Sequence, residues 1–321
     1  MPMTALDIYK VLPQTNCGDC GVPTCLAFAM QLATKKAGID DCPHATDEAK
    51  TALAGAEAPP IRMVSVGPEA HCIVMGKETV LFRHEETFYH PTAIAVRIRS
   101  DKPEPELRSA LDLVKALVFD RVGQYVRVEM VAIEDADGDP ERFAAAAAMA
   151  NEMDFGLMLI SSSPAVIEAA LPALSGQRPL LDAATAETWE AMAALAVEHA
   201  CPLVVRGADM DELADLTTKV AGLGVNDLII DSGARGLRPT LRDLTQFRRL
   251  ALRRQFRPVG YPALAVVTAE DPIDQMTEAA AYISKYAAIV LVDELEPWQA
   301  LAMVTVRQNI YTDPQKPIQV E

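Results

Sequence analysis

Four cysteines near the start of the chain have the type and spacing that metal chemistry needs. They are Cys17, Cys20, Cys25 and Cys42, in the pattern C-x2-C-x4-C-x16-C. Four thiolates complete the coordination of one metal centre, either a tetrahedral zinc or an iron–sulfur cubane. The chain has 321 residues. A dense cysteine cluster in a chain of this size favours metal binding, because disulfide frameworks are typical of small secreted chains.

The residues around these cysteines favour a 4Fe–4S cluster over zinc. Gly18 and Gly21 directly follow two of the cysteines, and residues without a Cβ let backbone N–H groups turn toward inorganic sulfide. Cys25 is expected in the first turn of a helix over 25–37, with its thiolate at the positive end of the helix dipole. The last cysteine precedes a proline, as in ferredoxin-type runs. Structural zinc sites more often carry two paired C-x2-C motifs, so zinc stays open as the less favoured alternative.

The cysteines lie in a short N-terminal segment that depends on its metal for stability. The segment has few large apolar side chains, and a domain of about 55 residues buries too little surface to be stable without further support. A run of small residues that ends in Pro59-Pro60 follows, and consecutive prolines favour an extended linker. We therefore expect a cluster domain with its linker over 1–58 and a second domain over 59–321.

The second domain repeats one unit, a short apolar strand followed by an amphipathic helix. Most of the strands are continuous apolar runs, as expected of parallel strands that are buried on both faces. Eight such units in about 220 residues predict a (β/α)8 TIM barrel. A doubly wound open sheet is the alternative, but no glycine-rich dinucleotide fingerprint follows the first strand. The predicted strands are 93–98, 126–133, 155–160, 179–183, 202–206, 227–231, 263–268 and 288–292.

A short extension precedes the first barrel strand. Its apolar runs predict three strands over 61–66, 72–75 and 79–83. Gly76 and Lys77 are expected to form the turn between the last two of them. Because the extension is too short to form a domain of its own, we assign it to the barrel domain. We expect it to form a small sheet or hairpin that closes the floor of the barrel.

The acidic composition excludes several classes of partner. Lys and Arg together number 29, Asp and Glu together number 45, and the formal net charge is −16. Nucleic acids and anionic membranes are bound by basic surfaces, so neither is expected as a partner. No apolar run approaches the roughly 20 residues of a membrane-spanning helix, and the first residues show no signal-peptide pattern. We therefore expect the protein in the cytoplasm.

Several other reactive side chains have simpler interpretations. Polar residues follow the predicted strands, where barrel active sites gather; they are compatible with a pterin pocket, but ordinary helix caps are favoured. His84 and His90 flank two glutamates that could help bind a metal, although packing or surface roles are favoured. Cys72 and Cys201 are expected to be buried small apolar side chains. The polar residues are Asp182, Thr185, Arg206, Asp209, Asp231, Ser232, Thr268, Glu270, Asp271, Asp293 and Glu294.

The N-terminal sequence and several later segments resemble one known family. The opening contains Thr-Asn-Cys-Gly-Asp-Cys-Gly-Val-Pro-Thr-Cys, with Cys42-Pro43 beyond it. It is similar to the start of the corrinoid iron–sulfur protein large subunit, also called the gamma subunit of the acetyl-CoA decarbonylase/synthase complex. The resemblance is specific and covers essentially the whole chain. It continues through Ala58-Pro59-Pro60-Ile61, Leu81-Phe82-Arg83-His84-Glu85, Phe88-Tyr89-His90, Asp120-Arg121-Val122-Gly123 and residues 308–315.

This resemblance implies a fold, cofactors and partners. In the family a 4Fe–4S module precedes a (β/α)8 barrel, and a C-terminal domain binds a cobamide. The implied function is a methyl carrier of the Wood–Ljungdahl pathway, which accepts methyl from a methyl-tetrahydropterin on Co(I) and delivers it to acetyl-CoA synthase. The cluster, held by the four cysteines, would return Co(II) to Co(I). The implied partners are a smaller corrinoid iron–sulfur subunit in a heterodimer, the methyl-tetrahydropterin methyltransferase, and CO dehydrogenase/acetyl-CoA synthase.

Two other functions stay open, and one departure from the family matters. A carrier subunit would be catalytic only within its assembly. The alternatives are a stand-alone pterin-dependent methyltransferase barrel with a redox domain, and a scaffold whose cysteines hold zinc. The sequence stops at Glu321, where the family continues into its cobamide domain, and no Asp-x-His-x-x-Gly pattern is present. We therefore expect a truncated chain, with a natural two-domain variant as the alternative, and assign none of its residues to the cobamide.

Overall fold

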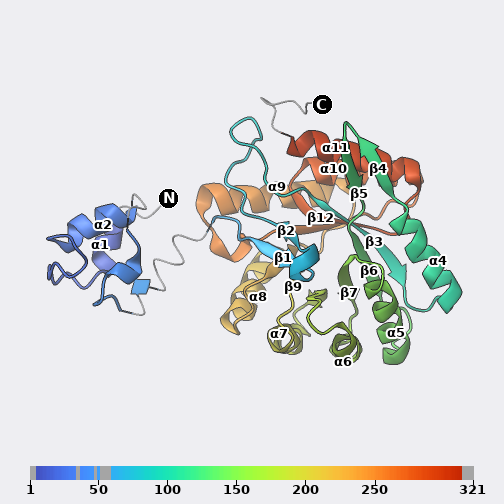
Figure 1. Ribbon diagram of the computed structural model, residues 1–321, viewed down its shortest axis with the longest axis horizontal. Helices are drawn as coiled ribbons and strands as arrows, with labels where there is room; N and C mark the ends of the chain where they lie inside the picture. The colour runs from blue at the N-terminus through green and yellow to red at the C-terminus, as the bar shows by residue number, and fades with distance from the viewer. Residues whose placement is uncertain (1–4, 34–36, 47–48, 51–58, 313–321) are drawn as a thin grey trace. The chain divides into compact units, whose positions relative to one another are not determined.

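The computed structural model describes residues 5–33, 37–46, 49–50 and 59–312, which fall into two compact units (Figure 1). The first unit is Met1–Pro59 together with Arg253–Gln255, and the second is Pro60–Leu252 together with Phe256–Glu321. The division between Pro59 and Pro60 lies one residue beyond the boundary that we expected from the sequence. The expected linker, 51–58, lies outside the described residues.

Short helices and a small apolar core form the first unit. The helices are α1 (Ala5–Val11) and α2 (Cys25–Ala33), and a 3-10 turn, η1 (Ile39–Asp41), follows them. Two of the cysteines are part of the core, so the residues proposed to bind metal also supply much of its apolar contact. The buried core side chains are Ile8, Leu12, Cys25, Phe28, Ala29, Leu32 and Cys42.

The helix α2 begins at Cys25, as predicted. The hydroxyl of Thr24 accepts a hydrogen bond from the backbone N–H of Ala27 at 3.1 Å, which satisfies one of the free donors at a helix start. The predicted helix over 25–37 is described as far as Ala33, and residues 34–36 lie outside the described residues. Cys25 therefore sits at the positive end of the helix dipole.

The second unit contains a closed barrel of eight parallel strands, which confirms the predicted TIM barrel (Figure 1). The hydrogen-bonded order is β3-β6-β7-β8-β9-β10-β11-β12, and β12 pairs with β3 to close the barrel. The barrel strands are β3 (Ala93–Arg99), β6 (Met130–Glu134), β7 (Gly156–Ile160), β8 (Leu180–Ala184), β9 (Leu203–Arg206), β10 (Leu228–Asp231), β11 (Ala263–Val266) and β12 (Ala287–Val292).

An α-helix follows each barrel strand and covers its outer face. Asp139, Asp209 and Asp271 each accept backbone N–H hydrogen bonds at a helix start. This is the capping role that the sequence favoured for Asp209 and Asp271. None of the described helices is long and apolar enough to cross a lipid bilayer. The helices are α4 (Glu104–Lys115), α5 (Pro140–Asn151), α6 (Pro164–Ala170), α7 (Trp189–Glu198), α8 (Met210–Gly222), α9 (Leu237–Arg254), α10 (Pro272–Ser284) and α11 (Pro297–Tyr311), with 3-10 turns η3 (Leu171–Leu174) and η4 (Arg257–Val259).

The predicted hairpin closes the floor of the barrel. Strands β1 (Val64–Val66) and β2 (Ile73–Met75) pair antiparallel, with the 3-10 turn η2 (Glu69–His71) between them. Their buried side chains belong to the same apolar cluster as the barrel interior. A Cβ at Gly156, the first residue of β7, would meet the Cδ1 of Ile73 at 2.5 Å. The hairpin therefore packs against the strand starts, opposite the end where barrel active sites form.

The prediction of a third strand in this extension, over 79–83, is wrong. These residues form a loop, whose backbone groups bond to a side chain instead of to a neighbouring strand. Arg248 of α9 donates to the carbonyl of Val80 at 2.7 and 2.9 Å and pairs with Glu78 at 3.0 Å. The buried guanidinium also lies over the rings of Phe88 and Tyr286, at 4.9 and 4.8 Å from their centroids. An arginine from far along the chain thus holds this loop in place.

The predicted strand 126–133 joins two elements that the structure separates. Its first residues belong to a hairpin of β4 (Val118–Arg121) and β5 (Gln124–Arg127), which the sequence did not predict. Val122 and Gly123 form its two-residue turn, both with positive φ, as type I′ turns require. The barrel strand β6 starts only after Glu129, whose carboxylate pairs with Arg307 at 2.7 Å. This charged residue interrupts the apolar run.

Candidate metal centre

The four cysteines proposed as cluster ligands all lie in the first unit. Cys17 and Cys20 lie on the loop that leads into α2, Cys25 is the first residue of α2, and Cys42 follows η1. Cys25 and Cys42 are buried in the core of the unit, each 6% exposed, and Cys20 packs against that core. Cys17 is exposed, and all four are free thiols. Three of the four sulfurs are therefore shielded in one apolar cluster and one faces solvent.

The loop that carries Cys17 and Cys20 has two glycines in a left-handed conformation, and one of its backbone N–H groups faces a cysteine sulfur. Gly18 and Gly21 both have a φ of +80°, a conformation that residues with a Cβ rarely adopt. The backbone N–H of Asn16 donates to the Sγ of Cys25 at 3.3 Å, and the Asn16 side chain accepts from the N–H of Cys25 at 2.8 Å. Hydrogen bonds to sulfur stabilise its negative charge when it is a metal ligand. The donor set and the loop conformation thus fit an iron–sulfur cluster.

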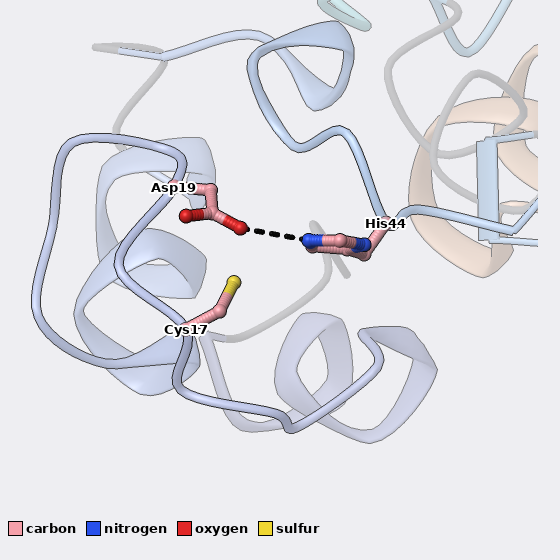
Figure 2. A group of neighbouring side chains, drawn as sticks. All are labelled: Cys17, Asp19 and His44. Atoms are coloured by element: carbon pink, nitrogen blue, oxygen red, sulfur yellow. Dashed lines mark hydrogen bonds and ion pairs between the residues drawn. The ribbon is translucent and has the colours of Figure 1, made fainter.

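Two further potential ligands lie beside Cys17 (Figure 2). The Nε2 of His44 and the Oδ2 of Asp19 are 2.8 Å apart. These two side chains and the Sγ of Cys17 place one ligand atom each within 4.8 Å of one another, in the one such group among the described residues. Hydrogen bonds from His44 and then Cys17 hold the pKa of Asp19 below its ordinary value. The sequence analysis missed this pair, although each residue lies two positions from a cysteine of the motif.

A second group of charged residues lies at the carboxyl ends of the barrel strands. Asp182 of β8 and Asp231 of β10 are almost fully buried, at 2% and 1% exposure. Arg206, at the end of β9, binds both oxygens of Asp182 at 2.8 and 2.9 Å and one oxygen of Asp231 at 2.8 Å. Arg235 binds both oxygens of Asp231 at 2.9 and 3.0 Å. The two carboxylates thus already have guanidinium partners.

The pKa values of the two buried carboxyl groups are shifted in opposite directions. Burial raises the pKa of Asp182 to about 6, even though the charge of Arg206 opposes this. Burial acts on Asp231 in the same way, but the hydrogen bonds from Arg235 and the charges of both arginines hold its pKa below the ordinary value. Asp231 has two arginine partners and Asp182 has one, which accounts for the difference.

Replacing Asp182 with Asn is expected to change how the stability of the barrel depends on pH. The raised pKa means that folded Asp182 binds its proton more tightly than in the unfolded chain, where its pKa is near 3.8. Its ionisation therefore destabilises the wild type as pH rises from about 4 to about 6. Each pKa unit corresponds to about 1.4 kcal/mol, so Asp182→Asn should gain about 2 kcal/mol relative to wild type between pH 4 and pH 7. Urea unfolding across this range tests it, and a difference that does not vary with pH contradicts it.

The two histidines singled out from the sequence are engaged in local contacts. The Nδ1 of His90 is hydrogen-bonded to the carbonyl of Gly76 at 2.8 Å, and the ring of His84 stacks on Phe82. Neither histidine belongs to a metal-binding group among the described residues. These contacts match the packing and surface roles that the sequence favoured.

The two isolated cysteines differ in burial. Cys201 is buried as expected, and burial raises the pKa of its thiol to about 11. Cys72 is exposed, so its expected burial is wrong. In the short strand β2, Met75 is buried toward the barrel, and the alternation of side chains in a strand places Cys72 on the opposite face.

Comparison with known proteins gives consistent matches to both units. A family model described as the CO dehydrogenase/acetyl-CoA synthase delta subunit matches residues 63–321, and a model describing an Fe-S cluster matches residues 12–44. The corrinoid/iron-sulfur protein large subunit of Moorella thermoacetica is 45% identical, over 100% of this chain and 72% of its own length. The acetyl-CoA decarbonylase/synthase complex subunit gamma of Methanothermobacter thermautotrophicus is 35% identical, over 100% of this chain and 73% of its own length.

Solved structures share the barrel at low sequence identity. Dihydropteroate synthase from Thermus thermophilus superposes with a TM-score of 0.52 at 16% identity, covering 75% of this chain and 98% of the other. This likeness concerns the fold alone. The full-length similarity to the large and gamma subunits is much closer, and it includes the cysteine loop. The chain therefore belongs to the family of the corrinoid/iron–sulfur protein large subunit and the acetyl-CoA decarbonylase/synthase gamma subunit.

Proposed function

We propose that this protein is a subunit of a corrinoid iron–sulfur methyl carrier, in which Cys17, Cys20, Cys25 and Cys42 hold a 4Fe–4S cluster. The observation that carries the proposal is that the match to the Fe-S model, residues 12–44, contains all four cysteines. It lies within a full-length similarity to a corrinoid/iron-sulfur protein. Burial of two of the ligands and the N–H donor to Cys25 support the same assignment.

The residues of the first unit suit a low-potential redox centre. When bound, a cysteine-ligated cluster transfers single electrons at potentials as low as about −700 mV, which is the range that reduction of Co(II) to Co(I) requires. The four cysteines would hold the irons as thiolates, and the Asn16 N–H would offset part of the negative charge at Cys25. The cysteines are free thiols, which suits a reducing compartment such as the cytoplasm.

The barrel serves this function as a scaffold and not as a pterin-binding enzyme. A pterin site of the kind considered from the sequence needs carboxylates at the strand ends that are available to ligand. Here Asp182 and Asp231 are buried and bound by Arg206 and Arg235. Asp209 and Asp271 cap helices. Glu270, Asp293 and Glu294 line a cavity at the same end of the barrel, so these carboxylates stay accessible. We favour the carrier subunit over a stand-alone methyltransferase barrel because the relatives that match the whole chain are corrinoid/iron-sulfur and decarbonylase/synthase subunits.

The proposed partners follow from the names of the relatives. The gamma subunits belong to an acetyl-CoA decarbonylase/synthase complex, and the matching barrel model is described as a CO dehydrogenase/acetyl-CoA synthase subunit. We propose that this chain forms a heterodimer with a smaller corrinoid iron–sulfur subunit. The assembled carrier would receive methyl from a methyl-tetrahydropterin methyltransferase and deliver it to acetyl-CoA synthase in the Wood–Ljungdahl pathway. We assign no described residue to the corrinoid.

Replacing a core ligand is expected to abolish the cluster. Protein purified without oxygen should be brown and contain about four irons and four sulfides per chain. Cys25→Ala should lose at least half of this iron, since it removes both a buried ligand and the acceptor of the Asn16 N–H. The matched control is Cys201→Ala, which removes a buried thiol of the barrel unit and should keep its full iron content. Colourless wild-type protein that contains zinc would support the zinc scaffold instead.

A further inference from the structure

Cys17 differs from the other three cysteines of the motif in both exposure and neighbours. It is exposed, whereas Cys25 and Cys42 are buried and Cys20 is partly buried. It is also the one cysteine that has further potential ligands close by among the described residues. The ligand atoms of Cys17, Asp19 and His44 lie within 4.8 Å of one another (Figure 2). The iron at Cys17 would thus have donors within reach that the other irons lack.

The side chains of His44 and Asp19, beside Cys17, are joined by one solvent-exposed contact. The Nε2 of His44 is bonded to the Oδ2 of Asp19 at 2.8 Å, and both side chains are about half exposed, at 50% and 53%. A contact with this exposure is weak because water competes for both groups, so it holds the ring beside Cys17 without locking it there. Asp19 comes from the loop with the first three cysteines and His44 from the segment after Cys42. The pair therefore joins both ligand-bearing segments.

Imidazole is an established ligand for iron in one class of iron–sulfur cluster, the [2Fe–2S] Rieske centres. In Rieske centres, histidine nitrogens replace two thiolates on one iron, and imidazole binds iron well in general. A carboxylate commonly orients a metal-binding histidine by accepting from the ring nitrogen that does not bind the metal. Asp19 instead bonds to Nε2 of His44, so binding of iron by Nε2 would replace this hydrogen bond. The imidazole of His44 is suited to an iron that has lost a thiolate, and Asp19 keeps the ring beside Cys17 until then.

We propose that His44 is a reserve ligand for the iron bound at Cys17. The proposal rests on the cluster assignment made above. The exchange is a ligand substitution without a change in oxidation state. The bond from iron to the Cys17 sulfur breaks and the freed thiolate takes a proton from solvent, while the hydrogen bond to Asp19 breaks and the Nδ1–H tautomer of His44 binds the iron through the lone pair on Nε2. Loss or modification of this exposed thiol would then leave the cluster intact.

The test compares ligand variants of the full chain after anaerobic reconstitution with iron and sulfide. Cys17→Ala should keep about four irons per chain and give an altered electron paramagnetic resonance spectrum when reduced. With 15N-labelled histidine, pulsed resonance should show a nitrogen coupling in this variant that wild type lacks. Cys17→Ala/His44→Ala should lose the coupling and hold about three irons per chain. Cys20→Ala, which has no such neighbours among the described residues, should likewise fail to keep the fourth iron.

A matched control separates the ligand role from the loss of any histidine. His71 pairs with Asp154 in the barrel unit at 3.4 Å, with side chains 54% and 50% exposed, which resembles the His44 pair in chemistry and exposure. Cys17→Ala/His71→Ala should therefore behave as Cys17→Ala does. The proposal is overturned if Cys17→Ala loses iron, shows no nitrogen coupling, or keeps four irons when His44 is also replaced. Wild-type protein without iron and sulfide would instead overturn the cluster assignment itself.

Discussion

Removing iron from this protein is expected to unfold the first unit and leave the barrel folded. Among the described residues of the first unit, the core has five buried apolar side chains besides its two buried cysteines: Ile8, Leu12, Phe28, Ala29 and Leu32. A core of this size cannot offset the conformational entropy of about 55 residues. Metal binding in small structural domains supplies free energy on the order of 10 kcal/mol. The barrel unit, in contrast, has two extensive apolar layers, one inside its strands and one beneath its helices.

Limited proteolysis of the iron-free protein measures this effect. After chelation under reducing conditions, a non-specific protease should digest residues 1–59 at least tenfold faster than in the iron-loaded protein, because the free energy of metal binding no longer stabilises the folded unit. A resistant fragment that begins near Pro60 should remain. Reloading with iron and sulfide should restore protection, which controls for damage during chelation. An iron-free first unit that resists the protease as well as the loaded one would show that its core is sufficient without metal.

Replacing Arg206 with Met is expected to destabilise the barrel by about 3–5 kcal/mol, because removing one partner of a buried ion pair leaves uncompensated charge. Arg206 is the one described arginine that bonds both Asp182 and Asp231. Its loss leaves Asp182 without a guanidinium partner and removes one of the two that Asp231 has. The effect should appear in urea unfolding of the barrel at pH 7 as a lower midpoint with an unchanged slope.

Two further variants separate the buried charge from the loss of an arginine. Arg99 pairs with Asp101 at 2.7 Å at the end of β3, with side chains 55% and 34% exposed, and Arg99→Met should change the stability of the barrel far less than Arg206→Met does. Arg206→Met/Asp182→Asn should recover part of the lost stability, because the unpaired charge is then absent. Equal effects of Arg206→Met and Arg99→Met would mean that water reaches the carboxylates at the barrel mouth.

Much of the barrel could be predicted because its signals are local. Each barrel strand is an apolar run, and turn or capping residues separate it from the next element, as Asp139 and Asp271 do at their helix starts. The errors arose where apolar runs continued across an element boundary. Residues 126–133 contain the end of a hairpin and the start of β6, and residues 79–83 look like a strand but are held as a loop by Arg248. In both places a distant arginine, Arg307 or Arg248, binds the segment.

The sequence by itself determined the proposed metal ligands and the eight-fold repeat, because spacing along the chain and strand periodicity are properties of neighbouring residues. Only the tertiary structure decided which side chains meet across long separations. His44 reaches Asp19 and Cys17 from beyond the core helix α2, and Arg206 joins acids from the two strands beside its own. Such contacts depend on the tertiary arrangement of segments that are far apart in the sequence. The charge and spacing of side chains along the chain do not specify that arrangement. The burial that shifts the pKa of Asp182 arises in the same way, from the packing of the whole barrel around it.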